Sequence, residues 1–380
     1  MGRGRSIGRA RGWRTLLQLS IAVGLIAVPG CSGLHSSSSP APEIPAEDTD
    51  TVSLSVKAAL AAPIVTITAK PQPSPTGDPH DYVSYARYWW PDPTRPEGLP
   101  FIRKDGHVNR AQLARGDRNK LDELATIVHT LASGWHLNRN TACAVRAGEW
   151  LRAWFVTPAT RMNPSLDYAQ IRLGHNHNRG SNSGLLDARG FAAVVEAITW
   201  LDDSPALTKQ EAVTIRQWFT EYLHWFTASE NGRLEHEASN NHGTWYLAQA
   251  IALARFVGNN ELARDLARED FARIAHQFAP DGSQPLEMVR TDGLSYCAFN
   301  LEAQFQVAKL AAPLGVDLWH FQATNGASLK QGLEFLRPYN ANPESWPHNQ
   351  LKKMEPGFLQ PLLDQAAQVW PAPGKPNATH

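Results

Sequence analysis

Residues 239–254 read SNNHGTWYLAQAIALA, a polar group of two asparagines, a histidine and a glycine followed by an apolar run. The apolar run predicts a buried helix, and Asn240 or Asn241 is a typical N-cap for it. Two interpretations follow. Either these residues only begin the helix, with Gly243 easing the turn and His242 a plain polar group, or they face a cleft. In that second case the free N–H groups and the dipole of the helix N-terminus favour an anion.

Helical periodicity extends over most of the chain on both sides of this stretch. Apolar residues recur at helical spacing in segments 121–137, 141–156, 185–201, 208–229, 260–279, 298–315 and 328–339, with Thr208 as a candidate N-cap. A clear β-type pattern occurs only in IVTITA, at residues 64–69. Because no solenoid-type repeat is found, and no linker between residues 60 and 340, we expect one all-α domain. The prediction is an α/α toroid of antiparallel helical hairpins over residues 56–345, with a C-terminal tail at 346–380.

The first 55 residues are expected to stand outside this domain. Residues 1–30 combine a basic leader with an apolar run too short to span a membrane, which predicts a signal peptide. Cys31 follows directly and is a candidate for lipidation, although Pro29 is unusual at such a site and ordinary signal cleavage is the alternative. Residues 31–55 are rich in Ser and Pro and predict a flexible tether. We expect a periplasmic or outer-membrane lipoprotein, or otherwise a secreted protein.

Composition limits the classes of partner. The 380 residues carry a formal net charge of zero, which argues against general affinity for nucleic acid or anionic membranes but allows a locally basic cleft. Contact with a membrane is expected only through the lipid anchor, and the protein is expected to be a monomer. Thirteen tryptophans either fill the core or line a groove on which sugars stack. After Cys31, only Cys143 and Cys297 remain, and they provide no disulfide framework.

Two long segments look like functional loops. Residues 80–109 are aromatic, basic and rich in proline, so long regular structure is excluded there. Trp89 and Trp90 in this segment either line a sugar groove or pin the segment to the helices. Residues 161–190 carry histidines, arginines and amides, and loops of this length usually have a function or are disordered. His175 and His177 are interpreted as plain polar groups, because no third metal ligand accompanies them; no metal and no cofactor is expected.

A second polar cluster lies at residues 284–300, where Arg290 and Tyr296 flank a DG pair. Together with Asn241 and His242 they supply the groups needed for β-elimination from a uronic-acid polymer. Arginine and an amide neutralise the carboxylate and stabilise the enediolate-like transition state. Histidine titrates in the range needed for the base, and tyrosine, with a pKa lowered by the nearby arginine, is the acid.

These motifs resemble the alginate lyase family of polysaccharide lyases. The matching stretches, in order between residues 81 and 339, are DYVSYARYWWPDPTRPEGLPFIRKDGHVN, WFVTPATRMNPSLDYAQ, NNHGTWY, PDGSQPLEMVRT, SYCAFNLEA and GVDLW. The resemblance implies an α/α toroid whose groove takes an anionic polyuronate such as alginate or glucuronan. It also implies the roles of the catalytic residues. Asn241 and Arg290 would neutralise the carboxylate, His242 would be the base for one epimer, and Tyr296 the acid or acid/base.

Four further residues are candidates for substrate binding: Asn182, Tyr246, Trp89 and Arg189. Asn182 stands where related lyases place another carboxylate-binding amide. The sequence departs from the family pattern in NHNRGSNSG, which replaces a shorter glycine-rich turn, and at Asp292, where many relatives have a basic residue. Both departures are expected to affect substrate preference.

Two other functions remain open from the sequence. A glycoside hydrolase on a similar toroid needs two carboxylates across the scissile bond, and Asp187, Glu235, Glu237 and Asp292 form no convincing pair. A non-catalytic sugar-binding lipoprotein would not need a set of proton-transfer groups. The sequence leaves undecided which uronate or epimer is cut and whether cleavage is endo or exo.

Overall fold

The computed structural model describes residues 56–70 and 72–371. The expected signal peptide, the tether and Cys31 lie outside the described residues. Helices form most of the described chain. The long ones are α3 (Arg118–Asn138), α4 (Thr141–Leu151), α5 (Phe191–Trp200), α6 (Lys209–Ala228), α8 (Asn241–Val257), α9 (Asn260–Gln277) and α11 (Gly293–Ala311). Shorter ones are α2 (Arg110–Leu113), α7 (Glu230–His236), α10 (Pro285–Met288) and α12 (Leu329–Leu336), and α13 (Gln360–Val369) is as long as α5.

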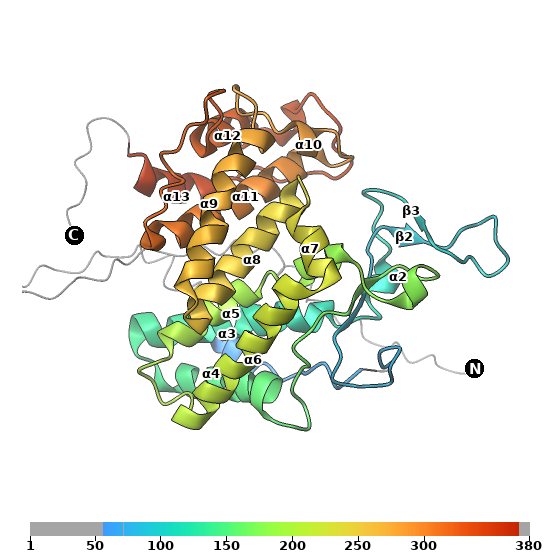
Figure 1. Cartoon of the computed structure of the whole chain (residues 1–380), viewed down its shortest axis with the longest axis vertical. Helices are drawn as coiled ribbons and strands as arrows, with labels where there is room; N and C mark the ends of the chain where they lie inside the picture. The colour runs from blue at the N-terminus through green and yellow to red at the C-terminus, as the bar shows by residue number, and fades with distance from the viewer. Residues whose placement is uncertain (1–55, 71, 372–380) are drawn as a thin grey trace, which may run out of the picture.

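Helices that are neighbours in the chain pack against each other, as α3 does with α4 and α8 with α9, and the arrangement agrees with the all-α toroid prediction (Figure 1). Of the 17 residues of α8, 14 are buried, and the helix packs against α5, α6, α9 and α11. Its apolar sequence is therefore explained by burial on all sides rather than by one amphipathic face. No helix among the described residues has the length and hydropathy needed to cross a membrane.

Local signals explain where several helices begin and end. The side chain of Asn240 accepts a hydrogen bond from the His242 N–H and caps α8, which ends at Gly258 in the left-handed conformation. Thr208 caps α6 in a capping box with Glu211, as its position predicts. Segment 141–156 forms α4 and then continues as a π-helical turn, Arg152–Val156.

Strands occur only as short pairs in the part of the chain that the structure describes, and not where the β-type pattern predicts one. Residues 64–69 form no strand. Instead, the Trp154 Nε1–H donates to the Val65 carbonyl oxygen, 3.0 Å away. This backbone carbonyl is therefore hydrogen-bonded to a side chain and not to a neighbouring strand. The strands lie in the two loop segments: β1 (Val83–Tyr85) pairs in parallel with β4 (Tyr168–Ile171), and β2 (Trp89–Trp90) pairs antiparallel with β3 (Ile102–Arg103).

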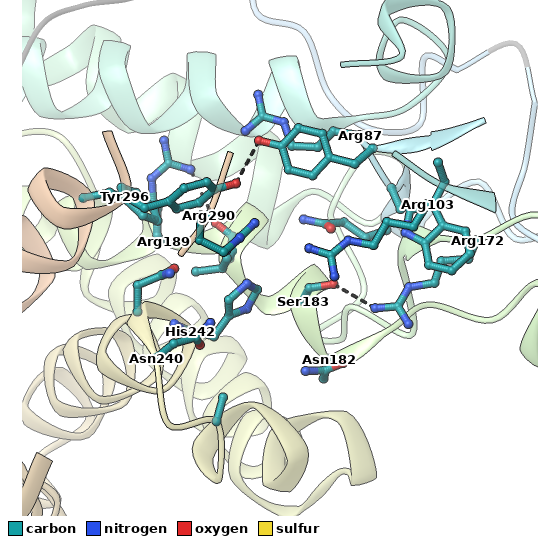
Figure 2. A pocket seen from close by; sticks show the side chains of 18 of the residues that line it. Arg87, Arg103, Arg172, Asn182, Ser183, Arg189, Asn240, His242, Arg290 and Tyr296 are labelled. Carbon is teal, nitrogen blue, oxygen red and sulfur yellow. Dashed lines mark hydrogen bonds between the residues drawn. The ribbon is translucent and has the colours of Figure 1, made fainter. Parts of the chain in front are cut away.

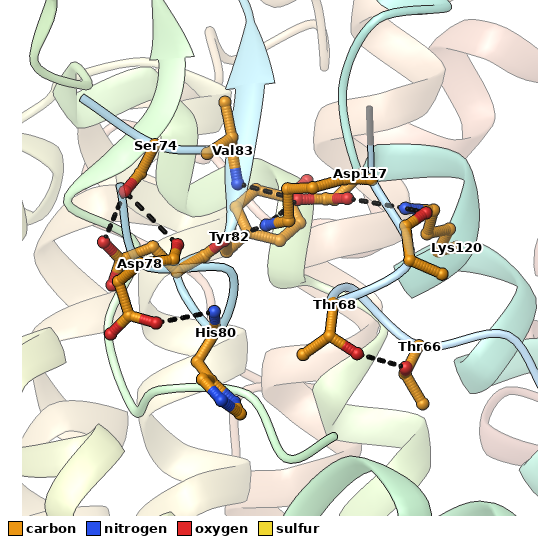
Figure 3. A network of polar contacts seen from close by, with 12 residues as sticks. Thr66, Thr68, Ser74, Asp78, His80, Tyr82, Val83, Asp117 and Lys120 are labelled. Carbon is orange, nitrogen blue, oxygen red and sulfur yellow. Dashed lines mark hydrogen bonds and ion pairs between the residues drawn. The ribbon is translucent and has the colours of Figure 1, made fainter. Parts of the chain in front are cut away.

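The N-terminal segment is held against α3 by a polar network (Figure 3). Asp117, at the start of α3, accepts hydrogen bonds from Lys70 Nζ (2.7 Å), Lys120 Nζ (2.9 Å) and the Val83 backbone N–H (3.0 Å). The side chains of Lys70 and Asp117 are only 4% and 1% exposed. This buried ion pair anchors the start of β1, from which the chain runs toward the cleft described below.

The end of the described chain also packs on the helical core. Trp346, Leu359, Leu362 and Ala366 are buried members of the main hydrophobic cluster. Residues of the expected tail, which begins at 346, thus contribute side chains to the same core. Cys143 and Cys297 are both buried free thiols and do not pair with each other.

Candidate active site

A cavity of about 370 Å³ lies where the first turns of α8 and α11 meet the two strand pairs. Figure 2 shows side chains from all of these elements converging on it. Its lining includes six arginines: Arg87, Arg103, Arg118, Arg172, Arg189 and Arg290. None of the lining residues, all of them in the described part of the chain, carries a carboxylate. The cavity is therefore an electropositive cleft suited to an anionic ligand.

Asn241 and His242 occupy the first turn of α8, and both line the cleft. The backbone N–H and the side-chain Nδ2 of Asn241 donate to the two carboxylate oxygens of Glu287, each at 2.7 Å. Since a carboxylate only accepts hydrogen bonds, this contact fixes which end of the amide is Nδ2. The Asn241 Oδ1 is buried and has no hydrogen-bond partner in the described part of the chain. Burial raises the pKa of Glu287, although its hydrogen bonds from Asn241 oppose that effect.

The imidazole of His242 is oriented by a buried glutamate. Its Nδ1 lies 2.6 Å from Oε1 of Glu235, whose side chain is 1% exposed, whereas the histidine side chain is 23% exposed. A neutral imidazole that donates from Nδ1 keeps a lone pair on Nε2, which is the form a general base requires. The other carboxylate oxygen of Glu235 accepts from Asn182 Nδ2 at 2.8 Å. One carboxylate thus orients two cleft residues.

The loop that leads into α8 is clamped from α9. Arg273 donates to the carbonyl oxygens of His236 (3.0 Å) and Ala238 (2.7 Å). A Cβ on Gly243 would lie 2.1 Å from the Ala238 oxygen and 2.2 Å from the Arg273 guanidinium. The glycine is therefore required by close packing beneath the first turn, rather than by a turn in the backbone.

Tyr296 lies in the first turn of α11, and Arg290 lies just before that helix. The Tyr296 hydroxyl is 3.0 Å from the hydroxyl of Tyr88, and the Arg290 guanidinium lies 3.9 Å from the centre of the Tyr296 ring. Burial, followed by the neighbouring Tyr88, raises the pKa of Tyr296, while Arg290 opposes the rise without overcoming it. The expectation of a lowered tyrosine pKa is therefore wrong, because the ring is mostly removed from water. A phenol in this state stays protonated, which is the form that an acid requires, while the raised pKa makes it a weaker proton donor.

Asp105 holds Arg290 in place. Its carboxylate accepts from Arg290 Nη2 at 2.9 Å and Nε at 3.2 Å, and from the Thr291 hydroxyl at 3.1 Å. Partial burial of Asp105 would raise its pKa, but hydrogen bonds and charge from Arg290 and Arg103 lower the pKa to about 2. The guanidinium is thus held by a two-point contact whose planar geometry is defined.

The family model of the alginate lyases matches residues 66–346. The chain belongs to the alginate lyase family. A solved alginate lyase from Bacteroides ovatus is 34% identical, with a TM-score of 0.79 over 84% of this chain and 87% of that one. Alginate lyase A1-III from Sphingomonas species A1 shares the fold at 16% identity, with a TM-score of 0.52 over 83% of this chain and 86% of that one. No curated protein matches the sequence.

A third structure, a histidine-to-alanine variant of alginate lyase A1-III complexed with a tetrasaccharide, is 17% identical, with a TM-score of 0.57 over 86% of this chain and 89% of that one. Membership of the alginate lyase family makes this protein a polysaccharide lyase and an enzyme, with a polysaccharide as its substrate. The hydrolase and non-catalytic alternatives are thereby set aside.

The lyase cleft brings together seven of the eight residues selected from the sequence. Asn182, Arg189 and Trp89 line it together with the four candidate catalytic residues. Tyr246 does not reach it. Its ring is 2% exposed and stacks on Phe226 and His236, with centroids 4.8 and 4.6 Å away, because this position faces α6 and α7 rather than the cleft. Tyr246 is therefore a residue of the packed core.

The two adjacent tryptophans of β2 lie on opposite faces of the strand. Trp89 lines the cleft, and Trp90 borders a separate open hollow with Lys104, where its Nε1–H donates to the His107 carbonyl oxygen at 2.9 Å. His175 packs edge-on against Trp89 at 4.8 Å, consistent with its interpretation as a polar structural group. Among the described residues no cluster of three or more His, Cys, Asp or Glu side chains is placed to hold a metal.

Three residues of the lyase site were missed by sequence reasoning: Glu235, Glu287 and Asp105. Each is an acidic side chain outside the cleft lining whose carboxylate is hydrogen-bonded to a residue that lines the cleft. Glu235 was considered only as a hydrolase carboxylate. Their local sequence gives no signal, since buried and surface carboxylates look alike there. Asp105 is 185 positions away from its partner Arg290.

Proposed function

We propose that this lyase cleaves a polyuronate, either alginate or a related polymer such as glucuronan, by β-elimination. The observation that carries the proposal is the arrangement of His242 on Glu235, opposite a protonated Tyr296, in a cleft lined by arginines and free of carboxylates. A polyanion is attracted electrostatically to such a cleft, whereas a neutral polysaccharide is not.

The carboxylate of the reacting uronate would be bound by Asn241 and Arg290. The Asn241 amide is held by Glu287 and the Arg290 guanidinium is held by Asp105, so both would act as donors in fixed positions. Neutralising the carboxylate acidifies the proton on the carbon next to it, because the negative charge that develops on the carboxylate oxygens is stabilised. Preorganised donors of this kind need no rearrangement as the charge develops.

His242 would take that proton on Nε2. The electron pair left on carbon forms the new double bond, and the bond to the glycosidic oxygen on the next carbon breaks. Tyr296 would protonate the departing oxygen, which leaves an imidazolium and a tyrosinate. The imidazolium is stabilised by Glu235, and the Tyr88 hydroxyl lies within hydrogen-bond reach of the tyrosinate. Proton exchange with solvent then restores both groups.

Y296F tests this assignment. The variant keeps the ring that packs on Arg290 but removes the acid, so formation of the unsaturated product should fall by roughly 10²–10⁴-fold. Product is followed by the ultraviolet absorbance of its conjugated double bond on polymannuronate, polyguluronate and glucuronan, with Y339F as a control far from the cleft. Full activity of Y296F would refute the mechanism. New reducing ends without the absorbance would show hydrolysis instead.

We also propose that the enzyme acts outside the cytoplasm, as a lipoprotein anchored at Cys31 or as a secreted protein. The basic and apolar leader at residues 1–30 supports this location. A monomeric state is proposed as well.

A further inference from the structure

Three of the six cleft arginines have no ion pair within the described part of the chain. Arg118 pairs with Asp122 and Asp187, and Arg290 and Arg103 share Asp105. No carboxylate lies within ion-pair distance of the remaining three, which are Arg87, Arg172 and Arg189. The cleft therefore holds more positive charge than the single carboxylate of the reacting sugar would use.

Of these three arginines, Arg172 has a side chain that is held by contacts with both Trp89 and Ser183. It directly follows β4, and its guanidinium lies 5.1 Å from the centre of the Trp89 ring. Its Nη2 donates to the Ser183 hydroxyl at 3.3 Å, and its Nε is buried without a partner. Trp89 is itself held in place by His175, whose Nε2 lies 2.7 Å from the Phe101 carbonyl oxygen. Trp89 thus supports an arginine with one face of its ring.

Arg103 lies beside this group. In the β2–β3 pair it stands directly across from Trp89, so its side chain emerges on the same face of the ribbon. Burial, and then the charge of Arg103, lower the pKa of Arg172. The two guanidinium groups thus repel each other, and an anion bound by both would relieve that repulsion.

The position of Arg103 and Arg172 relative to the candidate catalytic residues suits them to bind a neighbouring sugar. In Figure 2, Arg103, Arg172 and Ser183 lie on one side of His242, while Arg290 and Tyr296 lie on the other. All of them line the same cavity. A polymer that presents one carboxylate to Arg290 therefore extends a neighbouring sugar toward Arg172.

We propose that Arg172 and Arg103 form a second carboxylate site, which binds the uronate adjacent to the one that reacts. This inference rests on the proposed function. It implies that the lyase requires consecutive uronates, as in alginate or glucuronan, and works poorly on polymers in which uronates alternate with sugars that lack a carboxylate.

The test compares one polyuronate in two forms, fully charged and with about half of its carboxyl groups reduced to alcohols. Wild type, R172A and R172K are assayed on both, and R179A is the control. Arg179 belongs to the same segment, but its side chain is 59% exposed and outside the cavity lining. Thermal unfolding checks that each variant is folded.

On the fully charged polymer, R172A should lower kcat/KM by about 10- to 100-fold, mainly through a higher KM, because it removes binding shared by the ground and transition states. On the reduced polymer the loss should be clearly smaller. R172K keeps the charge but lacks the planar guanidinium, so its kcat/KM should lie between those of wild type and R172A. R172K replaces R172A in the test if R172A does not fold. R179A should match wild type on both polymers.

An equal loss for R172A on the two polymers, or no loss on either, would overturn the second carboxylate site while leaving the lyase mechanism intact. A wild-type enzyme that is inactive on every fully charged polyuronate would overturn the proposed function and the second site together.

Discussion

Glu235 is the residue whose replacement tests the site most directly, through the conservative variant E235Q. Glu235 is fully buried and makes two contacts, one to His242 Nδ1 at 2.6 Å and one to Asn182 Nδ2 at 2.8 Å. Both contacts need an acceptor, and a carboxylate supplies two. The amide of glutamine has nearly the same shape but supplies only one acceptor, because its other end is a donor.

Either orientation of the new amide is therefore unfavourable. If its oxygen faces His242, its NH₂ meets the NH₂ of Asn182, and two donors oppose each other. If its NH₂ faces His242, it donates to Nδ1, and the ring's proton moves to Nε2, where the lone pair of the base is required. In both cases the imidazolium that forms during the reaction loses a negatively charged partner.

The expected loss follows from these contacts. General base catalysis contributes about 10²–10⁴-fold, and an Asp-to-Asn change behind the histidine of a serine protease lowers kcat by about 10⁴-fold. E235Q should therefore lower kcat by about 10²–10⁴-fold, which corresponds to about 3–5 kcal/mol of activation free energy. KM should change by less than about threefold, since Glu235 does not line the cleft.

The assay measures initial rates of unsaturated product over a range of polymer concentrations. E237Q is the matched control, because Glu237 lies two residues further along and is exposed. It should retain wild-type kcat. A folded E235Q enzyme with kcat close to wild type, or one whose loss lies entirely in KM, would refute the orienting role of Glu235.

Two further predictions concern stability. Burial raises the pKa of Asp270 from 3.8 to about 7, so the folded state keeps a proton that the unfolded chain releases, and stability falls as pH rises through that window. In urea unfolding, D270N should therefore gain stability relative to wild type as pH rises from about 4 to about 7, by at most about 4 kcal/mol (about three pKa units at about 1.4 kcal/mol each). The exposed D265N should show no such trend, and a constant offset for D270N would contradict the assignment. K70M removes a buried partner of Asp117, which keeps other donors, so the free energy of unfolding should fall by about 1–3 kcal/mol. A fall no larger than that of the exposed K330M would show that the ion pair contributes nothing.

The helices could largely be predicted because their signals are local. Periodicity indicates segment 121–137 within α3, and side-chain caps mark where α6 and α8 begin. Periodicity alone indicates a helix from residue 298, whereas α11 begins at Gly293. The N–H groups of Leu294 and Ser295 are satisfied by Gln350, at 3.0 and 3.4 Å, from 55 or more residues away. A cap supplied by a distant side chain leaves no local signal.

The same distinction applies to the site. Asn241, His242, Arg290 and Tyr296 could be selected because their residue types suit one reaction and because their motifs resemble a family. The cleft does bring them together. The pKa of Tyr296 could not be predicted, because it depends on burial and on Tyr88, 208 positions away. A nearby arginine in the sequence indicates that the tyrosine pKa will be lowered by its charge. It does not indicate whether burial raises that pKa by more.

The placement of acidic groups argues for one chemistry on this fold. Glu235, Glu287 and Asp105 each accept hydrogen bonds from a residue that lines the cleft, and none of the three lines it. Negative charge thus lies one layer behind the surface, where it orients donors without repelling an anionic chain. Hydrolysis of a glycosidic bond would require two carboxylates that face the substrate. Here the carboxylates are occupied as acceptors, and in the proposed mechanism the groups that move protons are therefore an imidazole and a phenol, which suits elimination.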